Sequence, residues 1–425
     1  MFLRTASGCL VLGLIIGLML SACGGEEPGL RHQPVSVPSE SESFAPRLSV
    51  QGDQLYLSWL AVTDSGEHAL RFARYEDNDW SSVRTVAQGK DWFANWADTP
   101  GVRPVGAWLF AHWLVRSGPG TYDYDIHAAW SNDEGESWGE PFILHRDGVQ
   151  AEHGFLSSVV LPDGDLAVTW LDGRHMAGSM TGEAGHDHHE HHEHNGPMTL
   201  RWQRLVPGQP VKHQDPSQEL DDRVCDCCMT ASVLDEQGPL VFYRDRSESE
   251  VRDIAWQRPW LEDSESAEQS PDGGAVADDD WEIAACPVNG PAAARSGDSV
   301  GVAWFTAAQE QPRVLFTHGR ANEFADARRL DEGRALGRTT LSDWPEGGWL
   351  AVWMERLDDD TALRARLLDE TGKQAVQTLA SIPGSRQSGF PVSVKQGDSV
   401  FLAWTDMDTQ GKRRLRLARL SPGER

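Results

Sequence analysis

The sequence has few basic residues, few tyrosines and few cysteines, and it shows almost no helical periodicity. Lys and Arg number 38 against 65 Asp and Glu, which gives a formal net charge of −27. Because a protein needs a basic surface to bind the phosphate backbone, this balance argues against a nucleic-acid partner. The acidic residues are spread over turns and two polar loops, where their simplest role is solubility. The near absence of a 3.6-residue apolar repeat argues against a helical fold.

The N-terminus carries an apolar run from Cys9 to Met19, which is too short for a membrane-spanning helix. It leads into Leu20-Ser21-Ala22-Cys23, which resembles the lipobox of bacterial lipoprotein precursors. The resemblance implies that residues 1–22 are a signal peptide and that Cys23 becomes the lipidated first residue. An ordinary signal peptide followed by an unmodified cysteine is the alternative. Since Gly24 stands where aspartate would retain the protein in the inner membrane, we expect a periplasmic or cell-surface lipoprotein held by outer-membrane lipid.

Short apolar strands that end in an aromatic residue recur about every 50 residues or slightly more, which is the period of β-propeller blades. They end at Trp59, Trp113, Trp170, Tyr243, Trp304, Trp353 and Trp404. An entering strand precedes each of them, and a third strand and in most units a fourth strand follow. The sequence therefore predicts an all-β fold, in which residues 45–421 form one seven-bladed propeller, with six blades as the alternative. We expect a monomer.

Three segments fall outside this repeat. Residues 23–44 are predicted to be a linker, and residues 32–37 could supply a ring-closing strand, because the seventh unit has no fourth strand of its own. Residues 177–197 form an insertion rich in Gly, His and Glu. Residues 261–280 are acidic and rich in Ser and Gly, and we expect them to be a disordered loop.

One motif connects this repeat to a known family. The segment Ser131-Asn132-Asp133-Glu134-Gly135-Glu136-Ser137-Trp138 matches the Asp-box pattern S-x-D-x-G-x-x-W. Aspartate can cap a tight turn, glycine can take a conformation that other residues avoid, and tryptophan can fill the space between blades. The chain therefore resembles the sialidase, or BNR-repeat, superfamily of propellers. In that family the Asp-box is structural and lies on the face opposite the active site.

The family resemblance also implies a set of catalytic groups. Sialidases use an arginine triad for a carboxylate, an acidic proton donor, and a tyrosine nucleophile assisted by glutamate. Their arginine motif, F/Y-R-I-P, is missing here, and the nearest segment is Ala45-Pro46-Arg47-Leu48. If the chain is a glycosidase, Asp172, Asp245 or Glu355 would be the acid and Tyr243 the nucleophile.

Polar residues gather where the propeller topology brings loops together. Connections from strand two to strand three, and from strand four to the next blade, open on one face, which we call the mouth face. Besides Asp172, Asp245 and Glu355, the candidate ligand-binding residues there are Asp98, Arg174, Arg223, Arg244, Arg246, Arg252, Asn289, Arg338, Arg356 and Asp406. The guanidinium group of arginine binds a carboxylate through two parallel hydrogen bonds, so this ring of polar residues around the mouth face suits a polar or anionic ligand. Alternatively, these charges pair with one another and cap turns.

Cysteines and histidines are predicted to join the same face. Cys225, Cys227 and Cys228 precede unit four, and Cys286 precedes unit five, so the four thiols should converge and could bind zinc or copper. The alternative is one or two disulfides, for instance Cys286 with Cys225 or Cys228. The 177–197 insertion adds a histidine cluster that could bind zinc, copper or nickel, formed by His186, His188, His189, His191, His192 and His194. The motif C-D-C-C with C-P-V-N-G-P downstream resembles a subgroup of sialidase-like lipoproteins.

Two functions follow from these features. The first is a lipid-anchored extracytoplasmic binding protein that holds a metal or a polar or anionic small molecule or glycan at the mouth face. The second is a sialidase-like exo-glycosidase that acts on acidic glycans. The missing F/Y-R-I-P motif and the Cys/His cluster favour the first.

Overall fold

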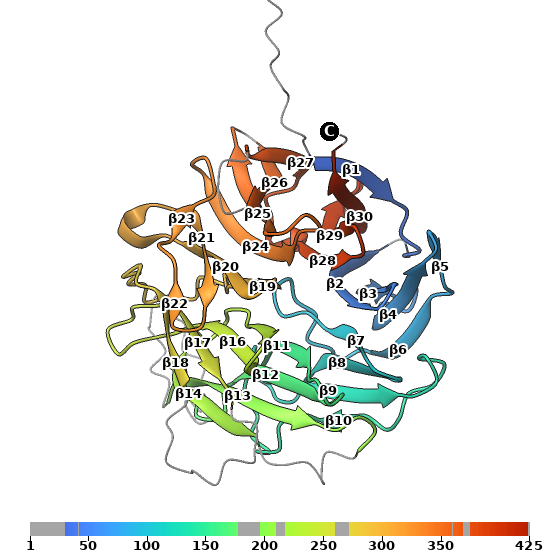
Figure 1. Cartoon of the computed structure of the whole chain (residues 1–425). Helices are drawn as coiled ribbons and strands as arrows, with labels where there is room; N and C mark the ends of the chain where they lie inside the picture. The colour runs from blue at the N-terminus through green and yellow to red at the C-terminus, as the bar shows by residue number, and fades with distance from the viewer. Residues whose placement is uncertain are drawn as a thin grey trace, which may run out of the picture.

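The structure, a computed structural model, describes residues 30–40, 42–176, 196–209, 217–259, 272–358, 360–368 and 375–423. These residues form seven antiparallel sheets arranged in a ring (Figure 1). Apart from strands, they contain two short 3-10 turns, Ala308–Glu310 and Arg386–Ser388. The seven-bladed β-propeller predicted from the repeat is confirmed, and the six-bladed alternative is wrong.

The blades follow one another along the chain, each starting at its innermost strand. Blade one comprises β2 (Ser43–Gln51), β3 (Gln54–Val62), β4 (His68–Glu76), β5 (Asp79–Trp80) and β6 (Arg84–Gly89). Blade two comprises β7 (Gly101–Val105), β8 (Trp108–Arg116), β9 (Tyr124–Ser131) and β10 (Phe142–Ile143). Blade three comprises β11 (His153–Val160), β12 (Leu166–Asp172), β13 (Met198–Leu205) and β14 (Gln218–Val224). Blade four comprises β15 (Ala231–Asp235), β16 (Gly238–Arg244), β17 (Ile254–Arg258) and β18 (Asp272–Ala277). Blade five comprises β19 (Ala292–Ser296), β20 (Ser299–Thr306), β21 (Arg313–Arg320), β22 (Glu323–Phe324) and β23 (Arg328–Arg329). Blade six comprises β24 (Ala335–Asp343), β25 (Trp349–Leu357), β26 (Asp360–Leu368) and β27 (Gln377–Ile382). Blade seven comprises β28 (Val392–Gln396), β29 (Ser399–Met407), β30 (Arg413–Pro422) and β1 (Leu30–Val35).

Blade seven combines the two ends of the described chain. Its outer strand β1 pairs antiparallel with β30, from Leu30 opposite Pro422 to Val35 opposite Leu417. Figure 1 shows these strands side by side, one blue and one red. The strand overlaps residues 32–37, which were expected to supply it, and starts two residues earlier. Pairing of the first and last strands leaves blade seven complete, so that the ring closes without an open gap.

The core is divided among the junctions between neighbouring blades. Seven clusters of buried apolar side chains occur, and each joins strands of two adjacent blades. The aromatic residues that punctuate the repeat lie in the second strands and are almost fully buried, Trp59, Trp170, Trp304 and Trp353 completely. Each large indole therefore contributes its burial energy to an interface between sheets, which explains why these residues recur at the same place in every unit.

The Asp-box forms the turn between β9 and β10. Asp133 accepts hydrogen bonds from the backbone N–H of Ser137 at 3.0 Å and from the hydroxyl groups of Ser131 and Ser137. These hydrogen bonds from Ser137 and Ser131 lower the pKa of Asp133 to about 2. Gly135 has φ +81°, which favours glycine, and Trp138 packs edge-on against Phe72 of blade one. The motif thus caps a turn and fills the junction of two blades, as expected.

The predicted disordered loop 261–280 needs correction. Residues 272–277 form β18, the outer strand of blade four, which pairs with β17 from Asp272 opposite Arg258 to Ala277 opposite Ile254. Local composition gave no sign of this strand, because its Gly and Ala residues bury little apolar surface. The backbone hydrogen bonds of the exposed edge of β17 supply the stabilisation instead.

Among the described residues, no helix is long and apolar enough to cross a membrane. Residues 1–29 and 177–195 lie outside the described part of the chain. The signal peptide, the lipid attachment at Cys23 and the six loop histidines therefore remain predictions.

Candidate functional site

The four cysteines of the described residues, Cys225, Cys227, Cys228 and Cys286, meet on the mouth face, as the topology predicted. Disulfides join Cys227 to Cys286 and Cys225 to Cys228. The first links the loop that enters blade four to the loop that enters blade five. Cys225 and Cys228 are buried, whereas Cys286 is exposed. The pairing differs from the predicted Cys286–Cys225 or Cys286–Cys228 bond, and thiolate ligands for zinc or copper would form only after reduction of these bonds.

An ion-pair network covers the buried disulfide. Arg246 donates to Asp226 at 3.0 Å and to Glu250 at 2.6 Å, and Arg252 donates to Glu250 at 2.8 Å. Arg252 Nη1 also lies 3.5 Å from Cys225 Sγ. Both guanidinium groups bind the carboxylates of Asp226, in the cysteine-bearing loop, and of Glu250. The two arginines predicted to bind a ligand therefore fix the loop that carries the cysteines.

Two of the predicted catalytic acids have a structural role. Asp172 accepts a hydrogen bond from the indole N–H of Trp170 at 2.9 Å, and Glu355 accepts one from Trp353 at 2.9 Å. Both carboxylates are buried, at 0% and 2% exposure. Burial opposes ionisation of Asp172, but hydrogen bonds from Arg174 hold its pKa below the ordinary value. A buried, ionised carboxylate cannot donate a proton to a substrate, so the acid role predicted for Asp172 does not fit the geometry.

Tyr243, the predicted nucleophile, is also withdrawn from solvent at 2% exposure. Its hydroxyl donates to Asp221 Oδ2 at 2.6 Å, and burial raises its pKa well above the ordinary value. Asp245 lies beside this pair and is half-buried. Burial, together with the charge of Asp221, raises the pKa of Asp245 to about 6. Of the residues predicted to be catalytic, only Asp245 combines partial exposure with a pKa suited to proton transfer.

Arg244 and Asn289 hold blades four, five and six together. Arg244 is 1% exposed and donates to the backbone carbonyls of Arg252, Asn289 and Phe305. Asn289 Oδ1 accepts the backbone N–H of Arg338 at 2.7 Å. Neither side chain is free to bind a ligand, which corrects the prediction from their position at the strand ends.

Asp98, a candidate ligand-binding residue, is buried and forms with Glu152 a pair of carboxyl groups around Tyr124, two residues that no sequence pattern singled out. The hydroxyl of Tyr124 lies 2.9 Å from Asp98 Oδ2 and 3.1 Å from Glu152 Oε1. One hydroxyl can donate only one proton, so one of the two carboxyl groups must be protonated and donate to it. Burial raises the pKa of Asp98 to about 6, and burial and the charge of Asp98 raise the pKa of Glu152 well above its ordinary value. A Cβ on Gly154 would lie 1.8 Å from Asp98 Oδ2, so glycine is required there.

The raised pKa of Asp98 predicts a pH dependence of stability. Protonated Asp98 favours the folded state, so this stabilisation is present below the ordinary carboxyl pKa of 3.8 and is lost as the pH rises through about 6. A change from 3.8 to about 6 corresponds to about 3 kcal/mol. Asp98→Asn should remove this dependence, which urea unfolding between pH 4 and pH 7 would measure. The exposed Asp64→Asn is the control, and a difference between wild type and Asp98→Asn that does not vary with pH would contradict the prediction.

Arg338 takes part in an aromatic group on the mouth face. The rings of Trp96 and Phe390 stack with centroids 5.7 Å apart, and the Arg338 guanidinium lies 4.7 Å from the Trp96 ring centre. Its Nη1 donates to the carbonyls of Ser385 and Gly389. Burial, and then the charge of Arg386, lower the pKa of Arg338 to about 10, so it stays charged at neutral pH. The cation is thus already held by protein groups.

The remaining predicted residues divide between paired and open positions. Asp406 accepts from Arg416 Nε at 3.0 Å in blade seven, far along the ring from blade four. Arg223 is half-buried, and its backbone N–H donates to Asp221. Arg356 is exposed and lines a cleft of about 390 Å³. The cleft lies on the mouth face of blade six.

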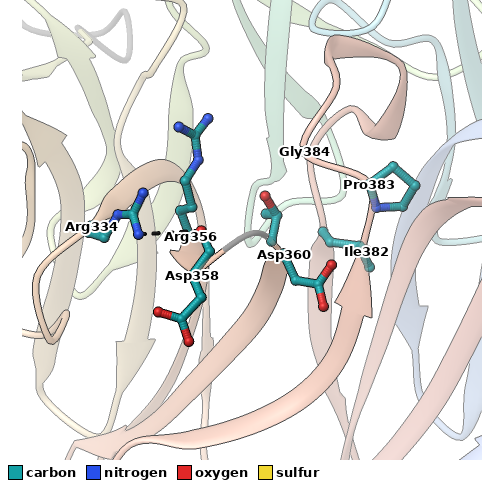
Figure 2. A pocket seen from close by; sticks show the side chains of 8 residues that line it. Arg334, Arg356, Asp358, Asp360, Ile382, Pro383 and Gly384 are labelled. Atoms are coloured by element: carbon teal, nitrogen blue, oxygen red, sulfur yellow. Dashed lines mark hydrogen bonds between the residues drawn. The ribbon is translucent and has the colours of Figure 1, made fainter.

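Figure 2 shows the side chains of this cleft. Arg334, Arg356 and Asp358 lie on one side, Pro383 and Gly384 lie on the other, and Asp360 lies between them. Arg334 Nη1 donates to the backbone carbonyl of Asp358 at 3.3 Å. Within the described ranges, the Arg356 guanidinium has no hydrogen bond or ion pair, and it points away from the Asp358 carboxylate. The sequence identified Arg356 here but not Arg334, which lies in the loop immediately before β24.

The fold is similar to those of several solved structures. A protein of unknown function from Dyadobacter fermentans matches with a TM-score of 0.51 and 9% identity, over 93% of this chain and 100% of that one. The polysaccharide lyase Uly1 matches with a TM-score of 0.50 and 8% identity, over 91% and 92% of the two chains. A variant of the NanB sialidase from Streptococcus pneumoniae matches with a TM-score of 0.44 and 7% identity, over 93% and 92%.

At these identities the likeness shows the fold, a β-propeller, and nothing about the reaction. No protein-family model matches the sequence, and no curated protein matches it either.

Proposed function

We propose that the protein is a lipid-anchored extracytoplasmic propeller that binds an acidic sugar at the mouth face, in the cleft formed by Arg334, Arg356, Asp358 and Asp360. The open guanidinium of Arg356 is the observation that carries this proposal. Arg174, Arg246, Arg252 and Arg244 on the same face are all committed to protein groups. Arg356 is therefore the predicted arginine best placed to receive a carboxylate from outside.

The rest of the cleft suits the other groups of such a ligand. A volume of about 390 Å³ lies within the range of about 300–1,000 Å³ usual for small-molecule sites. The Asp358 and Asp360 carboxylates can accept hydrogen bonds from sugar hydroxyls, while Arg334 lies next to Arg356 and adds a second cation. Binding without hydrolysis is favoured, because Asp172, Glu355 and Tyr243 are buried and hydrogen-bonded within the protein.

Arg356→Ala is expected to weaken the binding of N-acetylneuraminate or glucuronate about tenfold to a hundredfold. A hydrogen bond to a charged group contributes about 1.5–3 kcal/mol, and every 1.4 kcal/mol is a factor of about ten in affinity. Isothermal titration calorimetry at low salt measures the effect. Arg320→Ala is the matched control, because Arg320 is an exposed arginine at the end of β21 on the opposite face.

Two outcomes would count against the proposal. Binding that Arg356→Ala leaves unchanged would move the site elsewhere. Release of the fluorophore from a fluorogenic sialoside above the blank rate would favour the sialidase-like hydrolase, and Asp245, with its pKa of about 6, would then be the first acid to replace.

A further inference from the structure

A second cleft, of about 680 Å³, lies between blades two and three on the face opposite the mouth face. It is lined by the start of β8, the end of β9, the Asp-box turn and the turn that follows β13. These turns join the first strand of a blade to the second, or the third strand to the fourth. They therefore lie on the face opposite the one that holds the cleft of Figure 2, and the proposed acidic-sugar site does not use them.

Tryptophan rings form the wall of this cleft. The rings of Trp108 and Trp130 lie with centroids 6.4 Å apart and planes at 82°, so they form a corner. The backbone of Gly208 fixes the first ring, because a Cβ on Gly208 would lie 2.3 Å from Trp108 Cη2. Trp138 extends the wall, and its own ring is held edge-on against Phe72. An apolar corner whose rings are held by their neighbours suits the flat, carbon-bearing face of a small ligand.

Unused hydrogen-bond donors lie at the same cleft. Trp130 is 7% exposed, and its indole N–H has no hydrogen-bond partner in the described part of the chain. The buried indoles of Trp170 and Trp353, by contrast, each donate to a carboxylate. The exposed side-chain amides of Asn132 and Gln209 also bond no protein group within the described ranges. Because a nearly buried indole N–H usually has a partner, these donors favour a ligand that carries acceptor oxygens.

The charges at the cleft select among such ligands. Glu140 is the one charged side chain in the described lining, where it is exposed and unpaired. The nearby Arg84 is paired with Glu136 of the Asp-box turn, so the lining offers no cation to an anionic ligand. Aromatic rings and a carboxylate attract quaternary ammonium groups, but these have no oxygen for the Trp130 N–H to bind. Sugar hydroxyl groups both accept and donate, so a neutral sugar matches the donors and the carboxylate together.

We propose that this cleft binds a neutral hexose, free or as a unit of a glycan, independently of the acidic-sugar cleft of blade six. The C–H face of the sugar packs against Trp108, and its oxygens accept hydrogen bonds from the Trp130 N–H. The amides of Asn132 and Gln209 bind further hydroxyl groups, one of which donates to Glu140. Proline-rich peptides also bind aromatic grooves, but proline has no N–H to donate to this carboxylate.

Ligand-observed saturation-transfer NMR on the full chain, with its disulfides intact, tests the proposal. The probes are methyl β-glucoside, methyl β-galactoside and cellotetraose, and we expect binding with the strongest transfer to C–H protons of one ring face. Asn132→Ala and Gln209→Ala should each weaken binding about threefold to tenfold, through loss of a neutral hydrogen bond. Trp108→Leu should weaken it at least about tenfold. Gln237→Ala is the matched control, an exposed glutamine between β15 and β16 on the same face, and should have no effect.

Thermal unfolding of each variant accompanies the titrations, because loss of the Trp108 ring can also loosen the junction of the two blades. The amide variants replace exposed side chains, so they test the site even if Trp108→Leu does not fold. Tighter binding of cellotetraose than of methyl β-glucoside would identify a glycan chain as the ligand, and equal binding a single sugar unit. Binding of none of the three sugars, binding of decaproline in their place, or binding that both amide variants leave unchanged would overturn the proposal. Arg356→Ala should not alter these affinities, so this site and the acidic-sugar site can fail separately.

Discussion

Arg244→Met is expected to lower the free energy of unfolding by about 3–5 kcal/mol, because each buried polar group left without a partner costs about 1–3 kcal/mol. Arg244 donates at 2.6–3.0 Å to the carbonyls of Arg252, Asn289 and Phe305, which come from blades four and five and the loop between them. Its guanidinium also lies 4.9 Å from the centre of the Trp281 ring. Burial lowers the pKa of Arg244 to about 10, so the cation persists at neutral pH.

Urea unfolding followed by tryptophan fluorescence measures this loss. Arg246→Met is the matched control, since Arg246 is two residues away, half-buried and paired only with carboxylates. Its replacement should cost at most about 1 kcal/mol, as for other ion pairs near the surface. Equal losses for the two variants would mean that Arg244 does not hold the two blades together as its hydrogen bonds indicate.

Replacement of Cys227 and Cys286 together by serine should lower the free energy of unfolding by about 4 kcal/mol. The bond joins residues 59 positions apart, and the chain-entropy relation for a loop of this length gives about 4 kcal/mol. The Cys225–Cys228 bond spans three positions, for which the same relation gives about 1.6 kcal/mol. The exposed cross-link between the two entry loops is thus the more stabilising of the two.

Denaturant unfolding of the two double variants without reductant compares these effects. Thiol titration of a chain that starts after Cys23 should find no reactive thiol before reduction and four after it. Four free thiols with stoichiometric zinc in protein prepared without reductant would instead favour the metal site predicted for these cysteines. A larger loss from Cys225 and Cys228 would show that burial of the short bridge outweighs loop length.

The repeat could be predicted because its cause is local. A strand with one face in a blade junction needs alternating apolar residues, and the indoles of Trp59, Trp170 and Trp353 fill equivalent positions in different blades. Topology then places loops from distant parts of the sequence on one face, which is why Cys227 and Cys286 could be expected to meet. Which cysteine pairs with which depends on side-chain directions that spacing does not contain.

The roles of single charged residues could not be predicted in the same way. Asp172, Glu355 and Arg356 all lie two or three positions after the repeated tryptophan of a second strand, yet the first two accept indole N–H groups and only the last faces open solvent. The difference is set by the neighbouring tryptophans and by loops of other blades. The pairing of Asp98 with Glu152 was missed for a related reason, because the two side chains come from the loops before and after blade two.

The pairing of β1 with β30 has a consequence for how the molecule reaches its native state. Leu30 belongs to the first strand of the described chain to be synthesised, and it pairs with Pro422 near the end. Contacts of such sequence separation form slowly, so β1 must wait while six other blades assemble. During that time the outer edge of β30 exposes unpaired backbone groups that a second chain could occupy. The outer edge of β30 is therefore also the place at which two incompletely folded chains are most prone to exchange their β1 strands.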